Sequence, residues 1–291
     1  MNKIINDNNK PVVRVCTFNL RYDDIDHGTP NAWEKRKPIV YQCLRSIQPI
    51  IIGTQEGIPL QHNDILNDLN QSSQLWSWVG DDLKDPWQTT NAIYYRHDLF
   101  SLISSKIFWF NQNPFLAAPA WGAKHPRGCT RAHFQHKLTQ QPFIIYNLHL
   151  DYPSQNARHH SIPLLLSQIQ QNHDHIDRII VMGDFNNWPE EVDGITPIHE
   201  LILAGQKASE IEQMKAAGFV DTYEHGETPS FNGFRKAGYG PKIDFVWISS
   251  KSVYRVAGET KVDDYHDEEG YFPSDHFPVY ADLVYDASQS I

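Results

Sequence analysis

The sequence has 291 residues, of which 40% are hydrophobic and 21% charged, and its formal net charge is −10 at pH 7. This is the composition of a globular protein, and it excludes a fibrous or disordered chain. The acidic balance and the lack of a Lys/Arg run argue against tight, nonspecific binding to long nucleic-acid duplexes, because such binding usually depends on clustered basic residues.

The three cysteines, Cys16, Cys43 and Cys129, are too few and too far apart for a disulfide framework, which fits a reducing compartment. The polar opening MNKIINDNNKP shows no signal peptide, and no apolar run approaches the ~20 residues that span a bilayer. We therefore expect a soluble, cytoplasmic protein with no membrane span, and leave secretion by a non-classical route open. No linker or repeat is visible, so we expect a single domain over residues 1–291 with its core over about 12–285.

Apolar runs and helical spacings predict the secondary-structure elements along the chain. In chain order, strands are expected over Val12–Phe18, Pro49–Gly53, Ala92–Tyr95, Arg131–Leu138, Phe143–Leu150, Arg178–Met182, Ile243–Ile248 and Val279–Tyr285. Helices are expected over Trp33–Ile47, Ile58–Leu69, Gln155–Gln171 and Pro197–Gln206. Strands outnumber helices and many neighbours lack an intervening helix. This pattern favours a mixed or antiparallel α/β fold in which two sheets pack face to face with helices outside.

Polar residues follow the first two of these strands. In TFNLR, Asn19 comes where the first strand ends, and in GTQE, Glu56 comes directly after an apolar strand. A carboxylate at the edge of a core needs a partner, a set of hydrogen bonds or a metal. The ordinary alternatives are a turn asparagine and a solvated loop glutamate.

Two further clusters follow strands in the middle of the chain. In NLHLD, strand alternation places His149 on one face with Asn147 and Asp151. In VMGDFNNW, Asp184 and Asn186 are two residues apart, so a carboxylate and a carboxamide can face one site. A structural histidine and a turn aspartate are the alternatives.

The last cluster lies near the carboxyl terminus. Asp275 and His276 are adjacent in SDHFPV, just before a predicted strand. Asp244 lies among apolar residues in KIDFVW, where an unpaired carboxylate is costly. A histidine partner would satisfy it and hold the imidazole in one tautomer. The alternative is that Asp244 faces solvent.

The clusters together supply oxygen ligands and only two histidines. Mg²⁺ prefers one or two carboxylates together with waters and phosphate oxygens. Zinc sites have denser His/Cys ligation. The set of residues therefore favours Mg²⁺ or Mn²⁺.

Six strings, TFNLR, GTQE, NLHLD, GDFNNW, KIDFVW and SDHFPV, resemble the motifs of the endonuclease/exonuclease/phosphatase superfamily in that family's order. The resemblance covers about residues 12–285. TFNLRYDD, NAWEKRK and FNGFRKAGYGPKIDFVW are similar to a bacterial branch of unassigned substrate. The resemblance implies a four-layer α/β/β/α sandwich of the DNase I-like fold. It also implies a Mg²⁺-dependent phosphoesterase that hydrolyses a phosphodiester or phosphomonoester by metal-assisted attack of water.

The resemblance further implies metal ligands. Glu56 is expected as the principal ligand, with Asn19 nearby and Asp275 as a second carboxylate. For substrate binding, Arg131 begins a strand from which it could reach a phosphate, with a structural ion pair as the alternative. Trp188 follows GDFNN directly, so its indole could stack on a base or cover an apolar group.

Roles in catalysis are implied for five residues. Asp184 and Asn186 are expected to orient the attacking water and the phosphate. His149 is expected to contact the phosphate or donate a proton. His276, oriented by Asp244, is expected to contact the scissile phosphate.

Three functions remain open from the sequence. The first is a phosphoesterase acting on a small molecule or lipid, the second a DNA or RNA nuclease, and the third a catalytically silent binding module. Retention of the polar residues in all six strings argues against silence. The string GYGPKIDFVW lacks the pattern of inositol 5-phosphatases, which disfavours that activity. We expect a compact phosphoester, a nucleotide or a short single-stranded nucleic acid to be preferred over long duplex DNA.

Overall fold

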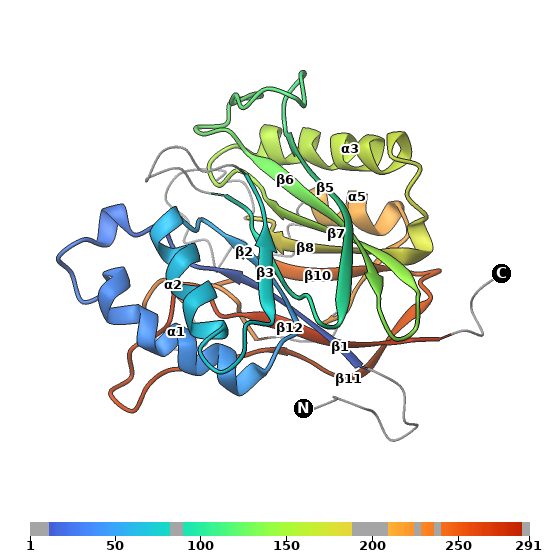
Figure 1. Ribbon diagram of the computed structural model, residues 1–291. Helices are drawn as coiled ribbons and strands as arrows, with labels where there is room; N and C mark the ends of the chain where they lie inside the picture. Colours follow the sequence, from blue (N-terminus) through green and yellow to red (C-terminus); the bar gives the residue numbers. More distant parts are fainter. Residues whose placement is uncertain (1–11, 82–89, 188–208, 224–227, 236–239, 287–291) are drawn as a thin grey trace.

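The structure is a computed structural model that describes residues 12–81, 90–187, 209–223, 228–235 and 240–286 (Figure 1). These residues form two six-stranded mixed sheets. The first has the strand order β11 (Tyr254–Val262), β12 (Val279–Tyr285), β1 (Val12–Asn19), β2 (Ile51–Gln55), β4 (Ile93–Arg96) and β3 (Trp76–Val79). The second has the order β5 (Phe100–Trp109), β6 (Gly128–His136), β7 (Pro142–His149), β8 (Ile179–Asp184), β10 (Asp244–Ser249) and β9 (Phe219–Asp221).

Helices cover the outer face of each sheet, so the described chain has four layers (Figure 1). The first sheet is covered by α1 (Trp33–Ile47) and α2 (Pro59–Leu69), and the second by α3 (Gln155–Gln171) and α5 (Ser209–Ala216). Short 3-10 turns lie at η1 (Asp24–Asp26) and η2 (Ile176–Arg178). The expected α/β/β/α sandwich is confirmed.

Side chains alternate between the two faces of each strand and so contribute to three apolar cores. One core lies between the sheets, and one lies under the helices on each outer face. On β1, Val13 and Val15 face the core between the sheets, whereas Cys16 and Phe18 face the core under α1 and α2. The central strands of the second sheet divide their side chains in the same way, between the inter-sheet core and the core under α3. Strands that are apolar on both faces are expected where both faces of a sheet are covered.

Two glycines allow the backbone to approach its neighbours closely at the centre of the molecule. A Cβ on Gly183, whose φ is 144°, would lie 2.0 Å from the carbonyl oxygen of Leu148 on the adjacent strand. A Cβ on Gly53 would lie 2.5 Å from the Met182 side chain of the other sheet. These contacts bring β2, β7 and β8 together just below the edge where their carboxyl ends lie.

The sequence predicted α1 and α3 with the bounds observed, and the eight expected strands are present within a few residues. Four strands and one helix were not predicted: β3, β5, β9, β11 and α5. β5 was missed because four consecutive residues in its middle are exposed, so it shows no apolar alternation. The expected helix Pro197–Gln206 lies outside the described residues. Among the described helices, none combines the length and the apolar character that crossing a membrane requires.

Candidate active site

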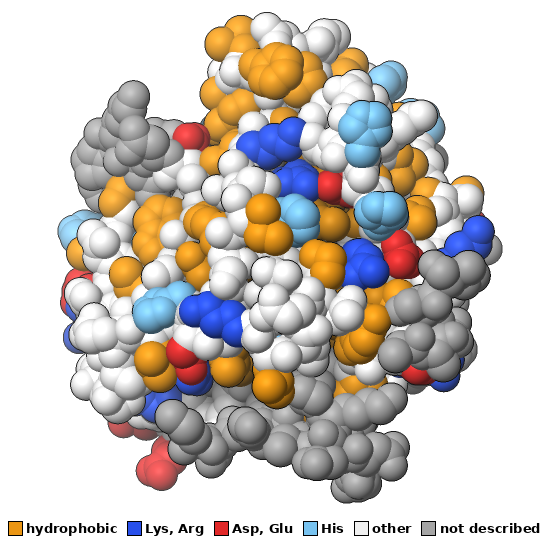
Figure 2. Space-filling view, turned by 45° about the vertical axis from the view of Figure 1, so that its right-hand side comes forward, with side chains coloured by type: hydrophobic (Ala, Val, Ile, Leu, Met, Phe, Trp, Pro, Cys, Tyr) orange, Lys and Arg blue, Asp and Glu red, His pale blue; other side chains and the backbone are white. Residues whose placement is uncertain are grey.

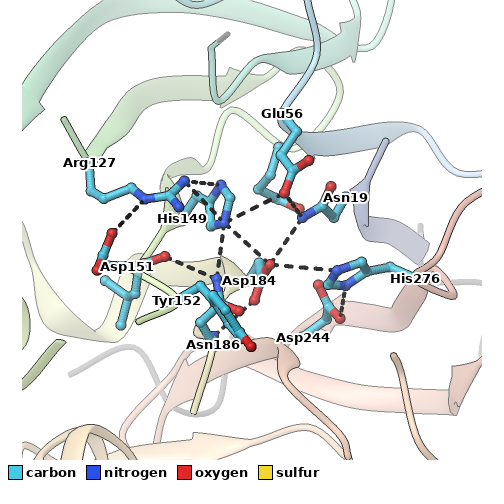
Figure 3. A network of polar contacts seen from close by, with 12 residues as sticks. Asn19, Glu56, Arg127, His149, Asp151, Tyr152, Asp184, Asn186, Asp244 and His276 are labelled. Atoms are coloured by element: carbon cyan, nitrogen blue, oxygen red, sulfur yellow. Dashed lines mark hydrogen bonds and ion pairs between the residues drawn. The ribbon is translucent and has the colours of Figure 1, made fainter. Parts of the chain in front are cut away.

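Side chains from both sheets meet at one edge of the sandwich (Figure 3). β1 pairs with β2, and β7 with β8, in parallel, so their carboxyl ends lie at the same edge of their sheets. β10 runs antiparallel to β8, and its first residue, Asp244, is paired with Asp184. Topology alone therefore gathers the polar residues that end β1, β2, β7 and β8 and begin β10.

Asn19 joins the two sheets at the centre of this site. Its Nδ2 donates to Glu56 Oε1 and to Asp184 Oδ2, each at 3.0 Å. The second oxygen of Glu56 accepts a hydrogen bond of 2.8 Å from the backbone N–H of Tyr22. One amide thus lies between two carboxylates that come from different sheets.

The backbone of two site residues is held in the left-handed region. Glu56 has φ 63° and Asn186 has φ 44°, although neither is a glycine. Such conformations cost about 1–3 kcal/mol each, and they persist where the surrounding structure fixes them. In Asn186 the conformation is supported by its N–H, which donates to Asp184 Oδ1 at 2.9 Å. With the backbone in this conformation, the side chains of both residues lie in the site (Figure 3).

His149 is held on three sides. Its Nε2 lies 3.0 Å from Asn186 Nδ2, 3.4 Å from Asp184 Oδ2 and 3.9 Å from Glu56 Oε1. The Arg127 guanidinium lies against the ring, with Nη1 3.1 Å from Nδ1. Arg127 in turn pairs with the buried Asp151 at 3.3 Å. The imidazole edge is thereby fixed toward the two carboxylates (Figure 3).

Asp244 and His276 form a buried pair on the other side of Asp184. His276 Nδ1 lies 2.8 Å from Asp244 Oδ2, and its Nε2 points to Asp184 Oδ2 at 3.8 Å. Ser230 donates to the same Asp244 oxygen at 2.7 Å. The other oxygen, Asp244 Oδ1, has no hydrogen-bond partner among the described residues. The carboxylate orients the imidazole and leaves Nε2 facing the centre.

Crowding of charge shifts the pKa values of these groups. Burial and the neighbouring Asp244 raise the pKa of Asp184 to about 7, against the opposing effect of His276. Burial would lower the pKa of His276, but Asp244 and Asp184 outweigh it and raise that pKa to about 10. His276 is therefore an imidazolium at neutral pH, and it carries positive charge next to Asp184.

The pKa values of Glu56 and His149 move in the opposite direction. Burial, with Arg127 adding to it, holds the pKa of His149 well below its usual value, so the ring is neutral at pH 7. Burial opposes ionisation of Glu56, yet its pKa falls to about 2 through His149, Asn19 and the Tyr22 N–H. Because His149 is neutral at pH 7, the Glu56 carboxylate is stabilised by the two hydrogen bonds and by the positive charge of His276.

The donor set fits a hard divalent cation. One ligand atom each from Glu56, His149 and Asp184 lies within 4.8 Å of the other two. The Glu56 side chain is 23% exposed, so the group is reachable from solvent, whereas Asp184 is buried. Two carboxylates of different sheets converging on one point would repel each other, and a cation between them removes that cost. The group therefore offers two carboxylate oxygens and one imidazole nitrogen to a divalent cation.

Seven of the ten residues expected from the sequence lie together in this cluster: Asn19, Glu56, His149, Asp184, Asn186, Asp244 and His276. Asp275 is buried beside it and pairs with Arg21 at 3.1 Å. Among the described residues, a second group of potential metal ligands consists of Asp184, Asp244 and His276, and Asp275 belongs to neither group. Its carboxylate is therefore neutralised by a protein cation.

The other two expected residues do not join the cluster. Arg131 makes a bidentate pair with Asp174, at 2.7 Å from Nε to Oδ2, and contacts Ser104 as well. This is the ion-pair alternative, and the phosphate-contact role that the sequence suggested finds no support in the geometry. Trp188 lies outside the described residues.

Sequence reasoning missed three contributors to the site. Arg127 stands in none of the six strings, although it contacts His149 directly. Ser230, which fixes Asp244, stands in no recognisable string. Asn147 lies below the site and donates to the carbonyls of Thr54 and Ala92, which ties the second sheet to the first. Of these three residues, only Asn147 could have been recognised from the sequence, because strand alternation places it on the same face as His149.

Comparisons with known proteins identify the family and agree with the fold. The model of the endonuclease/exonuclease/phosphatase family matches residues 16–276. A crystal structure of a family protein from Bacteroides thetaiotaomicron is 26% identical, with a TM-score of 0.75 over 95% of this chain and 96% of that one. A mannosyl-6-phosphatase from B. thetaiotaomicron is 26% identical, with a TM-score of 0.73 over 94% of this chain and 100% of that one.

A further crystal structure, of an endonuclease/exonuclease/phosphatase from Bacteroides vulgatus, is 27% identical. Its TM-score is 0.74 over 95% of this chain and 100% of that chain. A comparison with curated protein sequences gave no match. The solved structures thus match the chain over almost its whole length.

Proposed function

Because the chain belongs to the endonuclease/exonuclease/phosphatase family, we propose that it hydrolyses a compact phosphoester with the help of Mg²⁺ or Mn²⁺. The observation that carries the proposal is the convergence of Glu56, Asp184 and the Asp244–His276 pair within one buried cluster. Hydrolases of phosphoesters need an aligned water and stabilised charge on the phosphoryl oxygens. The cluster offers both acidic and cationic groups for these tasks.

Glu56 and Asp184 would hold the cation, with His149 and the Asn19 amide beside them. When bound, such a cation polarises a phosphoryl oxygen and stabilises the leaving oxyanion. Asn19 then keeps the two carboxylates in place through the hydrogen bonds already present. We retain Asp275 only as a more distant carboxylate, because Arg21 already pairs with it.

Proton transfer and charge stabilisation fall to the remaining residues. Asp184 and Asn186 orient the attacking water, which loses its proton to solvent as its oxygen forms the bond to phosphorus and the ester P–O bond breaks. The His276 imidazolium, oriented by Asp244, lies 3.8 Å from Asp184 and donates to a phosphoryl oxygen. The leaving oxygen takes a proton from solvent. Asn186 Nδ2 lies against His149 Nε2 and donates to the carbonyl of Leu150, so it holds both at the site.

Two observations support a compact substrate. The chain has a net charge of −10, which leaves little affinity for the polyanion of a duplex. One of the similar structures is described as a mannosyl-6-phosphatase, an enzyme for a phosphate monoester on a sugar. A nucleotide or a short single-stranded end is also compact in this sense.

The proposal is tested by a substrate panel with Mg²⁺, with Mn²⁺ and with EDTA. Sugar phosphates, nucleotides, an aryl phosphodiester, phospholipids, short oligonucleotides and plasmid duplex are compared by kcat/KM at near-physiological salt. We expect metal-dependent turnover that is highest on a compact phosphoester and lost in Asp244→Asn. Efficient plasmid nicking with negligible turnover of small substrates would support the nuclease alternative. No turnover of any phosphoester would support the silent binding module.

A further inference from the structure

The string NAWEKRK, at the start of α1, contributes no side chain to the candidate active site, yet its Arg36 is a buried cation. Charged side chains are ordinarily solvated, like the Lys and Arg side chains visible on the face shown in Figure 2. Arg36 is only 1% exposed. Burial lowers the pKa of its guanidinium to about 10, so the group is still charged at neutral pH. A cation buried this deeply has to be held by its neighbours.

Within the described residues, every hydrogen bond of the Arg36 guanidinium goes to a backbone carbonyl. Its Nη1 donates to the carbonyl of Leu20 at 2.9 Å and to that of Pro273 at 2.8 Å. Nη2 reaches the carbonyl of Arg21 at 3.3 Å, and Nε donates to that of Asn31 at 2.5 Å. One side chain thus joins two loops that are far apart in the sequence.

These two loops carry the two sides of the candidate active site. The loop after β1 begins at Asn19, whose amide donates to Glu56 Oε1 at 3.0 Å. The loop before β12 contains His276, whose Nε2 lies 3.8 Å from Asp184 Oδ2. Ser274 of this second loop donates to the carbonyl of Asn19 at 2.7 Å, so the loops also contact each other directly. The relative position of the two loops therefore sets the relative position of Glu56 and His276.

Two aromatic rings hold the guanidinium of Arg36. Its central carbon lies 5.5 Å from the centroid of the Trp33 ring and 5.6 Å from that of Phe234. Phe234 belongs to the string FNGF, in which Asn232 donates to the carbonyl of Ser274 at 3.1 Å. A planar guanidinium fixed in this way can donate to both loops at once, whereas the ammonium of a lysine lacks the fork that this geometry requires.

The simplest alternative is that Arg36 only neutralises acidic neighbours. The charges of Asp275, Asp26 and Asp23 do oppose the effect of burial on its pKa. A neutralising arginine commonly donates to a carboxylate, as Arg21 does to Asp26 at 2.9 Å. Arg36 uses its donors for carbonyls of the site loops instead. Its bonding pattern therefore indicates that it fixes the position of these loops.

We propose that Arg36 is a positioning residue, which sets the separation between the Glu56 side of the site and His276 by bonding Leu20 and Pro273 at once. This role rests on the function proposed above, because that reaction requires a cation at Glu56 and the His276 imidazolium to act on one phosphate. Loss of the fork should displace His276 and lower kcat. The affinity for Mg²⁺ should stay close to that of wild type, because Glu56 itself is unchanged.

The experiment compares Arg36→Lys, which keeps the charge and removes the fork, with the matched control Arg131→Lys. Arg131 is a buried arginine as well, but it pairs with Asp174 away from the site. We expect Arg36→Lys to lower kcat by about 10- to 100-fold, and the control to stay within about twofold of wild type. Mg²⁺ affinity is measured by calorimetry in both variants.

A double-mutant cycle separates positioning from a merely structural role. If Arg36 acts through His276, Arg36→Lys should have little further effect on kcat in a His276→Ala background. If the lysine variant does not fold, Phe234→Leu replaces it, because this half-buried loop side chain supports the guanidinium and leaves Arg36 in place. It should give a smaller loss of kcat that also disappears in the His276→Ala background.

Crystal structures of wild-type protein and the variant supply a measurement that does not depend on turnover. We expect His276 Nε2 to move by about 1 Å relative to Asp184 in the Arg36 or Phe234 variant. An unmoved His276, or an equal loss of kcat with and without His276, would overturn the proposal. Absence of phosphoester turnover in wild-type protein would instead refute the proposed function, whereas a displaced His276 would still support the positioning by Arg36.

Discussion

Among the described residues, two clusters of charged side chains that contact the second sheet are built in opposite ways. In one, the Asp174 carboxylate accepts from the Arg131 guanidinium and from the Tyr146 hydroxyl, so each charge has a partner. In the candidate active site, Asp184 and Asp244 lie side by side on adjacent strands, and Asp244 Oδ1 lacks a partner among the described residues.

The difference distinguishes buried charges that hold the fold together from buried charges that are suited to catalysis. A buried pair with matched charges and complete hydrogen bonding adds little beyond holding the fold, although breaking it is costly. Like charges crowded in a reachable site shift pKa values and leave ligand atoms free, which are properties that catalysis uses. The two clusters should therefore respond to mutation in different measurements.

The largest effect is expected from Glu56→Gln. This change removes a carboxylate of the proposed cation site while the hydrogen bond from Asn19 can still form. We expect turnover to fall by about 10³-fold or more, and Mg²⁺ affinity measured by calorimetry to fall with it. The free energy of unfolding without metal should also fall at neutral pH, because the lowered pKa of Glu56 means that the folded state stabilises its ionised carboxylate. Unchanged Mg²⁺ binding in the variant would show that Glu56 is not a ligand.

The next effect concerns the Asp244–His276 pair. His276→Ala and Asp244→Asn should each lower kcat by about 10²- to 10³-fold, because the imidazolium is both a donor and a positive charge. The double variant should lose much less than the product of the two factors, since residues that act as a unit are not additive. Fully multiplicative losses would mean that the two residues act separately.

The contrasting cluster should show its effect in stability. Replacing Arg131 by Met leaves the Asp174 carboxylate buried without its cation, and we expect a loss of about 3 kcal/mol in the free energy of unfolding. In urea denaturation, Arg131→Met/Asp174→Asn should recover part of that loss. The kcat of either variant should stay within about twofold of wild type. A large loss of kcat in a folded Arg131→Met protein would restore the phosphate-contact role.

The smallest expected effect is a dependence on pH. In metal-free protein the pKa of Asp184 is raised to about 7 by burial and Asp244, from an ordinary value of 3.8. The folded state therefore retains a proton that the unfolded chain releases, and this contribution to stability is complete below about pH 3.8 and lost as pH rises through about 7.

A cation bound at Glu56 and Asp184 replaces that proton. Mg²⁺ should therefore stabilise the protein more at pH 8 than at pH 5.5, by a difference on the order of 1 kcal/mol. Thermal unfolding with and without Mg²⁺ at the two pH values measures this difference, and Asp184→Asn serves as the control that should abolish it. Equal stabilisation at both pH values would contradict a role for Asp184 in holding the cation.

The sequence could predict the site because its residues stand at strand ends, where alternation and apolar runs are easy to read. Asp244 was recognisable because an unpaired carboxylate among apolar residues is energetically unfavourable. In the structure its Oδ2 lies 2.8 Å from His276 Nδ1. The same reasoning could not distinguish Arg131 from Arg127. Both stand near one strand, and only the fold shows that Arg131 turns toward Asp174 while Arg127 turns toward His149.

Segments without a regular sequence pattern escaped prediction for a related reason. β11 shifts register between Val256 and Thr260, which interrupts the alternation of its side chains. Ser230 reaches Asp244 from a segment with no strand or helix pattern. In each case the contact joins segments that are apart in the sequence, so the local sequence pattern does not predict it.

The central claim is that Glu56 and Asp184, from different sheets, hold one divalent cation. Anomalous scattering from crystals grown with Mn²⁺ tests it directly, because the ion is located without reference to activity. The account predicts an anomalous peak within coordination distance of Glu56 and Asp184, and its absence in crystals of Glu56→Gln. A peak held by other residues, or none at this edge in the wild-type protein, would contradict it.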